Sequence, residues 1–391
     1  WSNHAKKSGT QNERDVICRA VNEGWDKETV GSHIIRNCHI HDCGQTGIVG
    51  HLGCAFSLIE NNHIHHINNK QELDGAEIGG IKLHAAIDTV IRRNHIHHCT
   101  RGLWLDWQAQ GTRVTQNLFH HNTPPDSAKI IYHLEMGEDI FVEVSHGPTL
   151  IDNNLLLSDH AARLSTQGVA MVHNLICGSF TKVGTGTDNG GLPRYTPYHV
   201  PHGTKINGFM TFLHGDMRFY NNIFLQQGVR FCFDEDMKSL NIDLNKYTGT
   251  FVYDEYPDPE EYEALDGNVF NYNRYYTHLP VSSEGNVFAN SARPCRTEKS
   301  STILEEPMSF QLEERADGWY FTLHTTMKPE GYDTTIVDTA RMGEAFEPEQ
   351  LFEAPDGSPI TINTDYFGIP VDSHPIPGPF AAIPGEAVRV W

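Results

Sequence analysis

Short segments in which apolar and polar residues alternate recur along the chain. Each segment contains Asn near its start. In chain order the segments are RNCHIHDC (36–43), ENNHIHHI (60–67), RRNHIHHC (92–99), TQNLFHHN (115–122), DNNLLLSD (152–159), VHNLICGS (172–179) and YNNIFLQQ (220–227), with weaker copies GNVFNYN (267–273) and GNVFANS (285–291). Alternation with a period of two is typical of a β-strand. No ten-residue stretch shows a convincing helical period, so the pattern predicts short strands throughout.

The spacing of these copies predicts how the strands are arranged. Copies follow one another after 20 to 24 residues where no loop intervenes, and after 32, 37 and 48 residues where loops are inserted. Such recurrence is typical of a parallel β-helix, whose coils stack in register. The repeated Asn would then form an inward amide ladder in which each side chain bonds the next coil. The predicted fold class is therefore all-β, a parallel β-helix.

Changes in composition suggest further divisions of the chain. Residues 298–347 contain SFQLEERADGWYFTLHTT, which alternates like an antiparallel hairpin with ADG as its turn and suggests a small β-sandwich piece. We expect an N-terminal strap (1–30), the β-helix (31–297), the β-sandwich piece (298–347) and a closing segment (348–391). Loops are expected at Asn68–Gly80, Thr123–Gly137, Thr181–Gly208 and Gly228–Gly267.

Four segments align on their apolar positions: GIVGHLG, GIKLHAA, GLWLDWQ and DIFVEVS. The alignment is anchored on one apolar residue in each segment: Ile48, Ile81, Leu103 and Ile140. Three residues after these anchors stand His51, His84, Asp106 and Glu143. If the coils stack, these side chains form one ladder, and the two carboxylates lie about 5 Å apart because neighbouring strands are ~4.8 Å apart. A retaining glycosidase needs roughly that distance between its nucleophile and its acid/base.

Alternation also predicts which side chains point outward. Lys82, Trp104 and Phe141 should share the outer face with the ladder, two residues before His84, Asp106 and Glu143. Asp106 lies near cationic candidates and should stay ionised as the nucleophile, whereas Glu143 has apolar neighbours and should serve as the acid/base. Trp104 or Trp107 would supply a stacking platform for a sugar ring.

Other polar residues near the two motifs are candidates with alternative roles. Lys82 and His84 would orient sugar hydroxyls or lie on the surface, Gln110 and Arg113 would bond substrate or brace the loop, and His146 would line the pocket. Arg163 is expected one coil beyond Glu143, turned away or paired with Asp159.

Three stretches carry a resemblance to a known family: EIGGIKLHAAID (77–88), GLWLDWQAQGTRVTQNLF (102–119) and DIFVEVSHGP (139–148). Here the chain resembles glycoside hydrolase family 120. The resemblance implies a right-handed parallel β-helix with an attached β-sandwich, Asp106 as nucleophile, Glu143 as acid/base and a sugar contact from Glu77. It also implies release of xylose from the non-reducing end of xylo-oligosaccharides with retained configuration.

The composition narrows the partners. With 29 basic and 50 acidic residues the net charge is −21, which argues against nucleic acid or an anionic membrane and fits a neutral sugar. No run of 18 apolar residues occurs, so no membrane span is expected. No signal peptide is recognised. The start WSNHAKK suggests a C-terminal portion of a longer protein or a processed chain, and a cytoplasmic location is favoured.

No cofactor is expected. The His-x-His pairs (His39/His41, His63/His65, His95/His97) could suggest zinc, but they lie along an extended wall, so ladder histidines with shared hydrogen bonds are the better interpretation and no metal is predicted. The eight cysteines are expected to be reduced and mostly buried.

Three functions remain open from the residues. The first is a retaining exo-acting glycoside hydrolase on xylo-oligosaccharides, the second a polysaccharide lyase or inverting hydrolase on the same fold, and the third a non-catalytic carbohydrate-binding solenoid. The sequence leaves open the choice of glycone and whether the chain forms a homo-oligomer.

Overall fold

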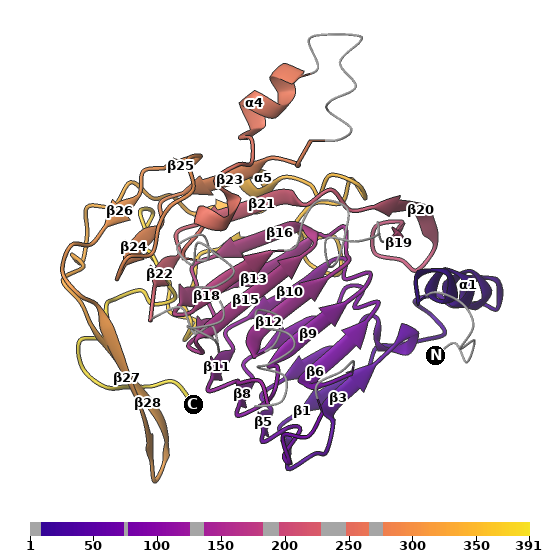
Figure 1. Ribbon diagram of the computed structural model, residues 1–391, viewed down its shortest axis with the longest axis horizontal. Helices are drawn as coiled ribbons and strands as arrows, with labels where there is room; N and C mark the ends of the chain where they lie inside the picture. The colour runs from indigo at the N-terminus through magenta and orange to yellow at the C-terminus, as the bar shows by residue number, and fades with distance from the viewer. Residues whose placement is uncertain (1–8, 74–76, 126–136, 183–194, 228–247, 266–276) are drawn as a thin grey trace, which may run out of the picture.

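The computed structural model describes residues 9–73, 77–125, 137–182, 195–227, 248–265 and 277–391. Their strands build three sheets of stacked parallel strands, as predicted for a parallel β-helix (Figure 1). The first sheet contains β1 (Ile34–Arg36), β4 (Leu58–Glu60), β7 (Val90–Arg92), β10 (Thr112–Thr115), β13 (Thr149–Asp152), β16 (Gln167–Val172), β21 (Gly215–Tyr220), β23 (Val281–Glu284) and β25 (Glu298–Lys299).

The second sheet contains the recurrent segments recognised in the sequence. Its strands are β2 (His39–His41), β5 (His63–His65), β8 (His95–His97), β11 (Leu118–His120), β14 (Leu155–Leu156), β17 (Leu175–Ile176), β22 (Ile223–Leu225), β24 (Val287–Ala289) and β26 (Thr302–Ile303). The weak copy at 267–273 lies outside the described residues.

The third sheet carries the aligned segments with the predicted ladder. It comprises β3 (Thr46–Gly50), β6 (Gly79–His84), β9 (Leu103–Asp106), β12 (Glu138–Glu143), β15 (His160–Ser165) and β18 (Ser179–Lys182). Figure 1 looks onto this sheet, with β6, β9 and β12 side by side.

The strands of the three parallel sheets turn alternate side chains into one apolar core. In the third sheet Ile81, Leu103 and Ile140 stack in register and are fully buried. The chain turns out of consecutive strands through left-handed residues at equivalent positions, at Ala85 (φ 53°), Trp107 (φ 44°) and Val144 (φ 43°). Stacked corners keep neighbouring strands in register, which is why equal offsets from each anchor fall on one ladder.

The predicted Asn ladder is present. Asn62, Asn94, Asn117, Asn154, Asn174, Asn222 and Asn286 each contribute, and the Nδ2 of one donates to the Oδ1 of the next at 2.9–3.0 Å. Each Oδ1 also accepts a backbone N–H from the preceding coil, so polar groups inside the wall are paired.

The N-terminal region differs from the expectation. Gly9–Asn22 forms α1, although no helical period was recognised in the sequence. Its apolar face is short: Val16 and Ile17 are buried, and Ile17 packs with Ala55 and Ile87. An apolar face this short is a weak signal by itself, and tertiary packing makes the segment a helix.

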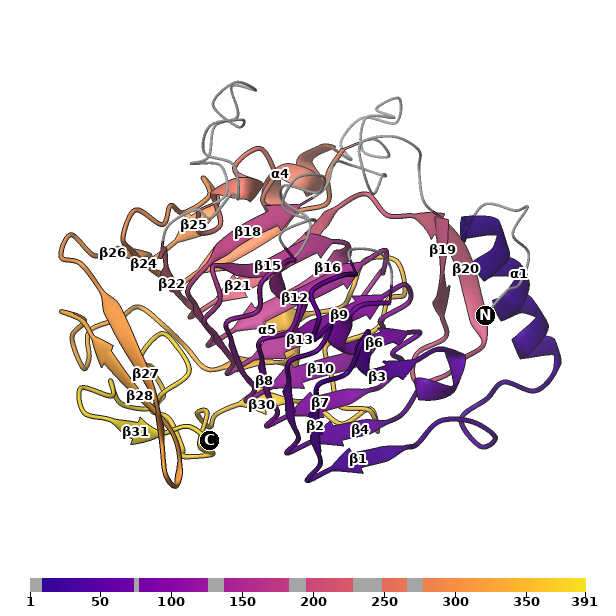
Figure 2. The ribbon, with the colours of Figure 1, turned by 60° about the horizontal axis from the view of Figure 1, so that its bottom comes forward.

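Two inserted regions contain structure of their own. Within the loops, β19 (Tyr195–His199) and β20 (Ile206–Thr211) form an antiparallel hairpin beside α1, as both views show (Figures 1 and 2). The region around residue 255 contains η3 (Phe251–Tyr253) and α4 (Pro259–Ala264), while η1 (Leu52–Cys54) follows β3.

The predicted hairpin with its ADG turn is confirmed as β27 (Ser309–Arg315) and β28 (Gly318–His324). Its third strand, β31 (Val388–Arg389), comes from the closing segment, so the described residues give a three-stranded sheet. Strands β25 and β26 extend the β-helix to Ile303, past the expected boundary at 297. The remaining elements are β29 (Val337–Asp338), α5 (Thr339–Met342) and β30 (Thr361–Ile362).

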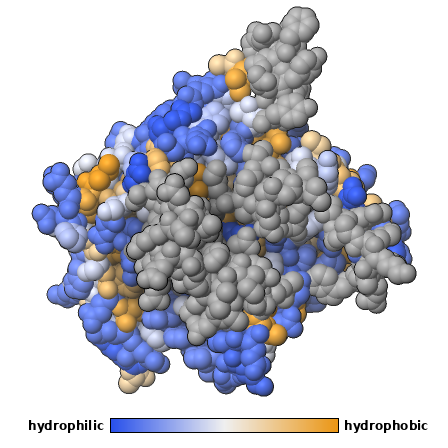
Figure 3. Space-filling view, in the orientation of Figure 1, coloured by the Kyte–Doolittle hydropathy of each residue, from blue (hydrophilic) through white to orange (hydrophobic). Residues whose placement is uncertain are grey.

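The described residues on the face shown in Figure 3 are mostly hydrophilic. On this face, the coloured hydrophobic residues occur in small groups among hydrophilic ones. No described helix combines the length and apolar character needed to cross a membrane. The seven described cysteines are free thiols, as expected, and Cys232 lies outside the described residues.

Histidines of the second sheet form the predicted ladders. Rings in equivalent positions stack, as His63 does on His95 with centroids 4.7 Å apart. Ring nitrogens also meet diagonally between coils, with His63 Nε2 2.8 Å from His97 Nε2 and His95 Nε2 2.7 Å from His120 Nε2. We call this cluster the histidine array; its members are His39, His41, His63, His65, His66, His95, His97, His98, His120 and His121.

The histidine array is expected to make the protein acid-labile. Burial first, and then neighbouring histidines, lower the pKa of His63 and of His98 to about 4 and that of His95 further. Because these folded-state values lie below the unfolded value near 6.5, the stability from neutral rings is complete above that pH and is lost as the pH falls toward 4. We expect the melting temperature to fall by about 10 °C or more between pH 7 and pH 4.

A double variant isolates the contribution of the histidine array. In the next two coils Leu118 and Leu155 occupy the positions in register with His95, so the second sheet already accommodates Leu there. His95→Leu combined with His120→Leu therefore removes one histidine pair without introducing a residue type foreign to this sheet. The double variant should lose less melting temperature on acidification than the wild type, whereas His324→Gln at an exposed position should behave like the wild type. Equal acid sensitivity in all three proteins would contradict the assignment.

Candidate active site

The predicted ladder exists in the third sheet. Asp106 pairs in register with Glu143 on one side and with His84 on the other. The anchors of these strands face the core, so all three polar side chains point to the outer face. The two carboxylates therefore lie on adjacent parallel strands, whose spacing is ~4.8 Å.

Asp106 is held by two cationic groups from the neighbouring strand. Its Oδ2 lies 2.8 Å from Lys82 Nζ and 3.0 Å from His84 Nε2. One oxygen is thus fixed by β6, and the other, Oδ1, is buried without a hydrogen-bond partner among the described residues.

Burial and charge together set the protonation of this pair. Burial by itself raises the pKa of Asp106, but the charges of His84 and Lys82 and their hydrogen bonds outweigh it and hold the pKa well below its usual value. Burial lowers the pKa of His84, yet the charge of Asp106 and the hydrogen bonds that the imidazole donates to Asp106 and Glu77 raise that pKa to about 9. At neutral pH the carboxyl group of Asp106 is therefore ionised, and the imidazole of His84 is protonated on both nitrogens.

Glu77 completes this group from the turn before β6. Its Oε2 lies 2.5 Å from Lys82 Nζ and its Oε1 lies 3.7 Å from His84 Nε2. Burial raises the pKa of Glu77, but hydrogen bonding to His84 and the charge of Lys82 bring it below the usual value. The backbone at Glu77 is left-handed (φ 61°), and this turn aims the side chain back over β6.

An aromatic side chain of the neighbouring strand contacts Glu143. The indole N–H of Trp104 donates to Glu143 Oε2 at 3.0 Å. The Trp104 ring stacks on Phe141 with centroids 5.2 Å apart, and the Arg101 guanidinium lies 4.3 Å from the centroid of Trp104. Trp104 therefore orients the carboxyl of Glu143 directly.

The expectation for Arg163 was wrong in register. Arg163 pairs with Phe141, and Ser165 is the residue that follows Glu143 on the ladder. The anchor of that coil is Ala162, so Arg163 is only one residue past it. Its guanidinium lies over the Phe141 ring at 4.4 Å.

Trp107 leaves the ladder at the corner of the coil. Trp107 is 5% exposed and packs with Val144 and Phe212. Its role as a stacking platform for a sugar ring stays a prediction, which rests on its position directly after Asp106.

Three predicted contact residues lie outside the group. Gln110 donates to the carbonyl of His199 at 2.8 Å and accepts from the His199 N–H at 2.9 Å, so it braces the β19–β20 hairpin. Arg113 forms two hydrogen bonds with Asp152 on the first sheet, because β10 belongs to a different wall of the coil. His146 Nε2 lies 3.3–3.4 Å from carbonyls of the same hairpin, and burial lowers its pKa to about 4.

Sequence reasoning missed a carboxylate that approaches from α1. Glu13 Oε1 lies 3.3 Å from His51 Nε2, 3.2 Å from Gln108 Nε2 and 3.9 Å from His84 Nδ1. The sequence contained one indication of this contact. Glu13 is four residues before Ile17, so in a helix the two side chains lie on the same buried face.

Two groups of three side chains here bring potential metal-ligand atoms within 4.8 Å of one another: Glu77, His84, Asp106 and Glu13, His51, His84. Both depend on His84, which is protonated at neutral pH and has Lys82 beside it. A ligating imidazole must be neutral, so the charges favour ion pairing here.

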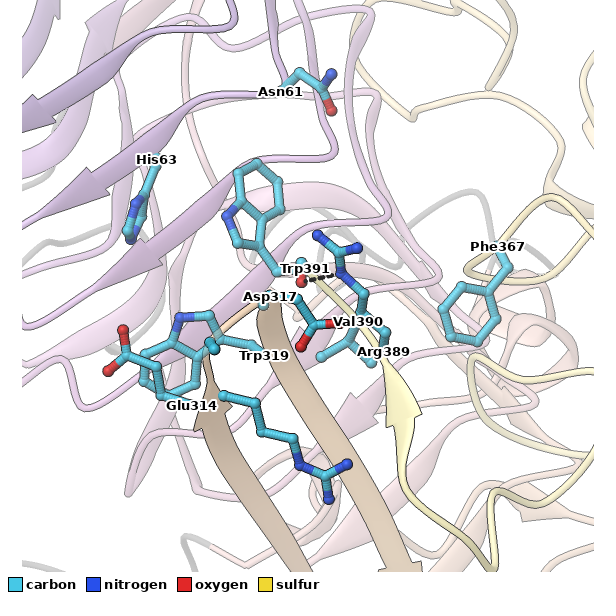
Figure 4. A pocket seen from close by; sticks show the side chains of 12 residues that line it. Asn61, His63, Glu314, Asp317, Trp319, Phe367, Arg389, Val390 and Trp391 are labelled. Atoms are coloured by element: carbon cyan, nitrogen blue, oxygen red, sulfur yellow. Dashed lines mark hydrogen bonds between the residues drawn. The ribbon is translucent and has the colours of Figure 1, made fainter.

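A hollow lies on another side of the molecule, between the histidine array and the three-stranded sheet. It has a volume of roughly 670 Å³, and its lining includes Trp319, Trp391, Arg389 and Glu314 together with His63 of the histidine array (Figure 4). It contains none of the ladder carboxylates.

Comparison with known proteins agrees with the fold. Residues 22–174 match the family described as "Right handed beta helix region". Among solved structures the chain is similar to "The complex structure of XylC with xylose", with a TM-score of 0.85 and 36% identity. The similarity covers 99% of this chain and 56% of the XylC chain, so this chain spans about half the length of XylC.

No curated protein matches the chain. The resemblance recognised from the three motifs is confirmed at the level of a XylC-like right-handed parallel β-helix.

Proposed function

We propose that this chain carries the catalytic centre of a retaining glycoside hydrolase that releases xylose from the non-reducing end of xylo-oligosaccharides. The observation that carries the proposal is the in-register pairing of Asp106 with Glu143 on adjacent strands of one outer face. The ~4.8 Å strand spacing suits the ~5–5.5 Å carboxyl separation of retaining enzymes better than the wider separation of inverting ones. The likeness to a structure described as a xylose complex supports the sugar class.

The electrostatics support the proposed roles of the two carboxylates. In the first step Asp106 Oδ1 forms a bond to the anomeric carbon, the bond to the leaving oxygen breaks, and Glu143 gives that oxygen its proton. In the second step water attacks the anomeric carbon, its proton passes to Glu143, and the bond to Asp106 breaks. Lys82 and His84 keep Asp106 ionised, and the Trp104 indole orients Glu143.

Glu77, Lys82 and His84 form the polar wall beside the nucleophile. Their donors and acceptors match the hydroxyls of a glycone, and Trp104 and Trp107 provide aromatic surfaces near the same carboxylates. This set gives the proposed substrate contacts, whereas Gln110, Arg113 and His146 are assigned to holding loops and sheets.

The stereochemical course tests the mechanism directly. We expect ¹H NMR of an aryl β-xyloside digest to show the β-anomer of xylose first, with the α-anomer appearing only by mutarotation. A first-formed α-anomer would show inversion, and unsaturated products would show a lyase. Binding of xylo-oligosaccharides without turnover, by a protein that also leaves other aryl glycosides intact, would favour the non-catalytic solenoid.

A further inference from the structure

Helix α1 brings a third carboxylate to the polar wall. Glu13, in the described part of α1, forms ion pairs with the site through its Oε1 to His51 and His84. Its side chain is 12% exposed, so solvent screens its charge only weakly. The same oxygen lies 3.2 Å from Gln108 Nε2, two residues past Asp106.

The packing of α1 fixes Glu13 in this place. Ile17, one helical turn later on the same face, is fully buried against Ala55 and Ile87. Trp25, just beyond the helix, belongs to the same cluster, and its indole N–H donates to the carbonyl of Leu52 at 2.7 Å. The helix is thus attached to the β-helix through Ile17 within it and through Trp25 just past its C-terminal end.

His84 lies between two carboxylates as a result. Its Nε2 is 3.0 Å from Asp106 Oδ2, and its Nδ1 is 3.9 Å from Glu13 Oε1. An imidazole with a carboxylate at each nitrogen is stabilised in its doubly protonated form. The other charged or titratable groups that face His84 are Lys82 and Glu77, on or next to β6, and His51 from the preceding coil.

Protonation of His84 brings the charges of this group closer to balance. Asp106, Glu77 and Glu13 supply three negative charges, against which Lys82 and protonated His84 supply two positive ones. Without Glu13, protonated His84 would lose the carboxylate beside its Nδ1, while Lys82 would still lie next to it.

We propose that Glu13 is a positioning residue for the proposed hydrolase, acting through His84 to hold the imidazolium against Asp106 Oδ2. The inference rests on the proposed function of Asp106 as nucleophile. Glu13 touches neither reacting carboxylate: its effect is to keep His84 charged and oriented, so that Asp106 stays ionised and presents Oδ1 to the anomeric carbon. Helix α1 is then part of the active site, where the sequence suggested only a strap.

Glu13→Gln tests this because it preserves size and removes the charge. Since His84 must be protonated, activity should decline above its pKa, and we expect the alkaline limb of the pH profile of kcat/KM to move down by about one pH unit. At the pH optimum kcat should fall by less than about tenfold, with KM nearly unchanged. Glu23→Gln, at an exposed position just after α1, is the matched control and should leave the profile unchanged.

Two further measurements separate positioning from a merely structural role. The ¹⁵N ring shifts of His84, assigned by their loss in His84→Gln, should titrate at lower pH in Glu13→Gln than in the wild type. In addition, Glu13→Gln should add little to the loss already caused by His84→Gln, because both act through one group. An unchanged His84 titration, or fully additive losses, would overturn the proposal even if Glu13→Gln is less active.

The outcome is distinguishable from a failure of the proposed function. An inactive wild type whose His84 titration still depends on Glu13 would refute the hydrolase and the catalytic consequence of the coupling. An active wild type whose His84 titration ignores Glu13 would refute only the role of Glu13.

Discussion

Asp106→Asn is expected to lower kcat on aryl β-xylosides by about 10⁴-fold or more, the largest effect predicted for this chain. The amide keeps the shape of the carboxyl but cannot form the glycosyl-enzyme. It also removes the charge that Lys82 and His84 surround, so the two cations lose their common partner. Initial rates measured from pH 5 to pH 8 should show the loss at every pH, because the pKa of Asp106 lies below this range.

A covalent probe distinguishes a nucleophile from a residue that merely stabilises charge. A 2-deoxy-2-fluoro xyloside with a good leaving group should add one glycosyl mass to the wild type, and peptide mapping should place it on Asp106. Asp42→Asn, at an exposed carboxylate, is the control and should keep wild-type activity. Label on another residue, or near-normal turnover by Asp106→Asn, would refute the assignment.

Glu143→Ala is expected to show the second largest effect, and its size should depend on the leaving group. For a poor leaving group, which needs protonation, we expect kcat to fall by about 10³-fold or more. For an activated leaving group the first step should be nearly preserved, and the slow step should become attack by water without a base. The measurement is a series of aryl xylosides of decreasing leaving-group pKa.

Azide should rescue Glu143→Ala on activated substrates, because azide attacks without a general base. The product should be the β-glycosyl azide, since the sugar passes through the covalent intermediate on Asp106. Glu138→Gln is the matched control: Glu138 lies on the same strand, is fully buried and pairs with Arg101, so its loss should affect stability and show no azide rescue. An α-azide, or no rescue at all, would contradict the acid/base role.

Trp104→Phe offers a finer test of the same site. The change keeps an aromatic ring on Phe141 but removes the N–H that donates to Glu143 Oε2. It should therefore impair the hydrolysis of poor leaving groups more than that of good ones, and wild-type selectivity would count against an orienting role for the indole.

The sequence by itself determined the fold and the ladder. Period-two alternation fixed which residues face the core, and the repeated Asn marked the start of each coil, so equal offsets from Ile81, Leu103 and Ile140 placed His84, Asp106 and Glu143 together. This works because stacked parallel strands convert equal sequence offsets into spatial neighbours. The same reasoning failed at Arg163, where the offset was counted from the wrong anchor.

Only the tertiary structure decided what approaches the ladder from elsewhere. Gln110 and Arg113 follow Asp106 closely in sequence, but the chain turns a corner after Trp107, so their side chains serve a loop and a different wall. Glu13 is remote in sequence and reaches His84 because the apolar face of α1 is buried on the β-helix. Local periodicity carries no information about such contacts, since they depend on where a separate element packs against the finished coil.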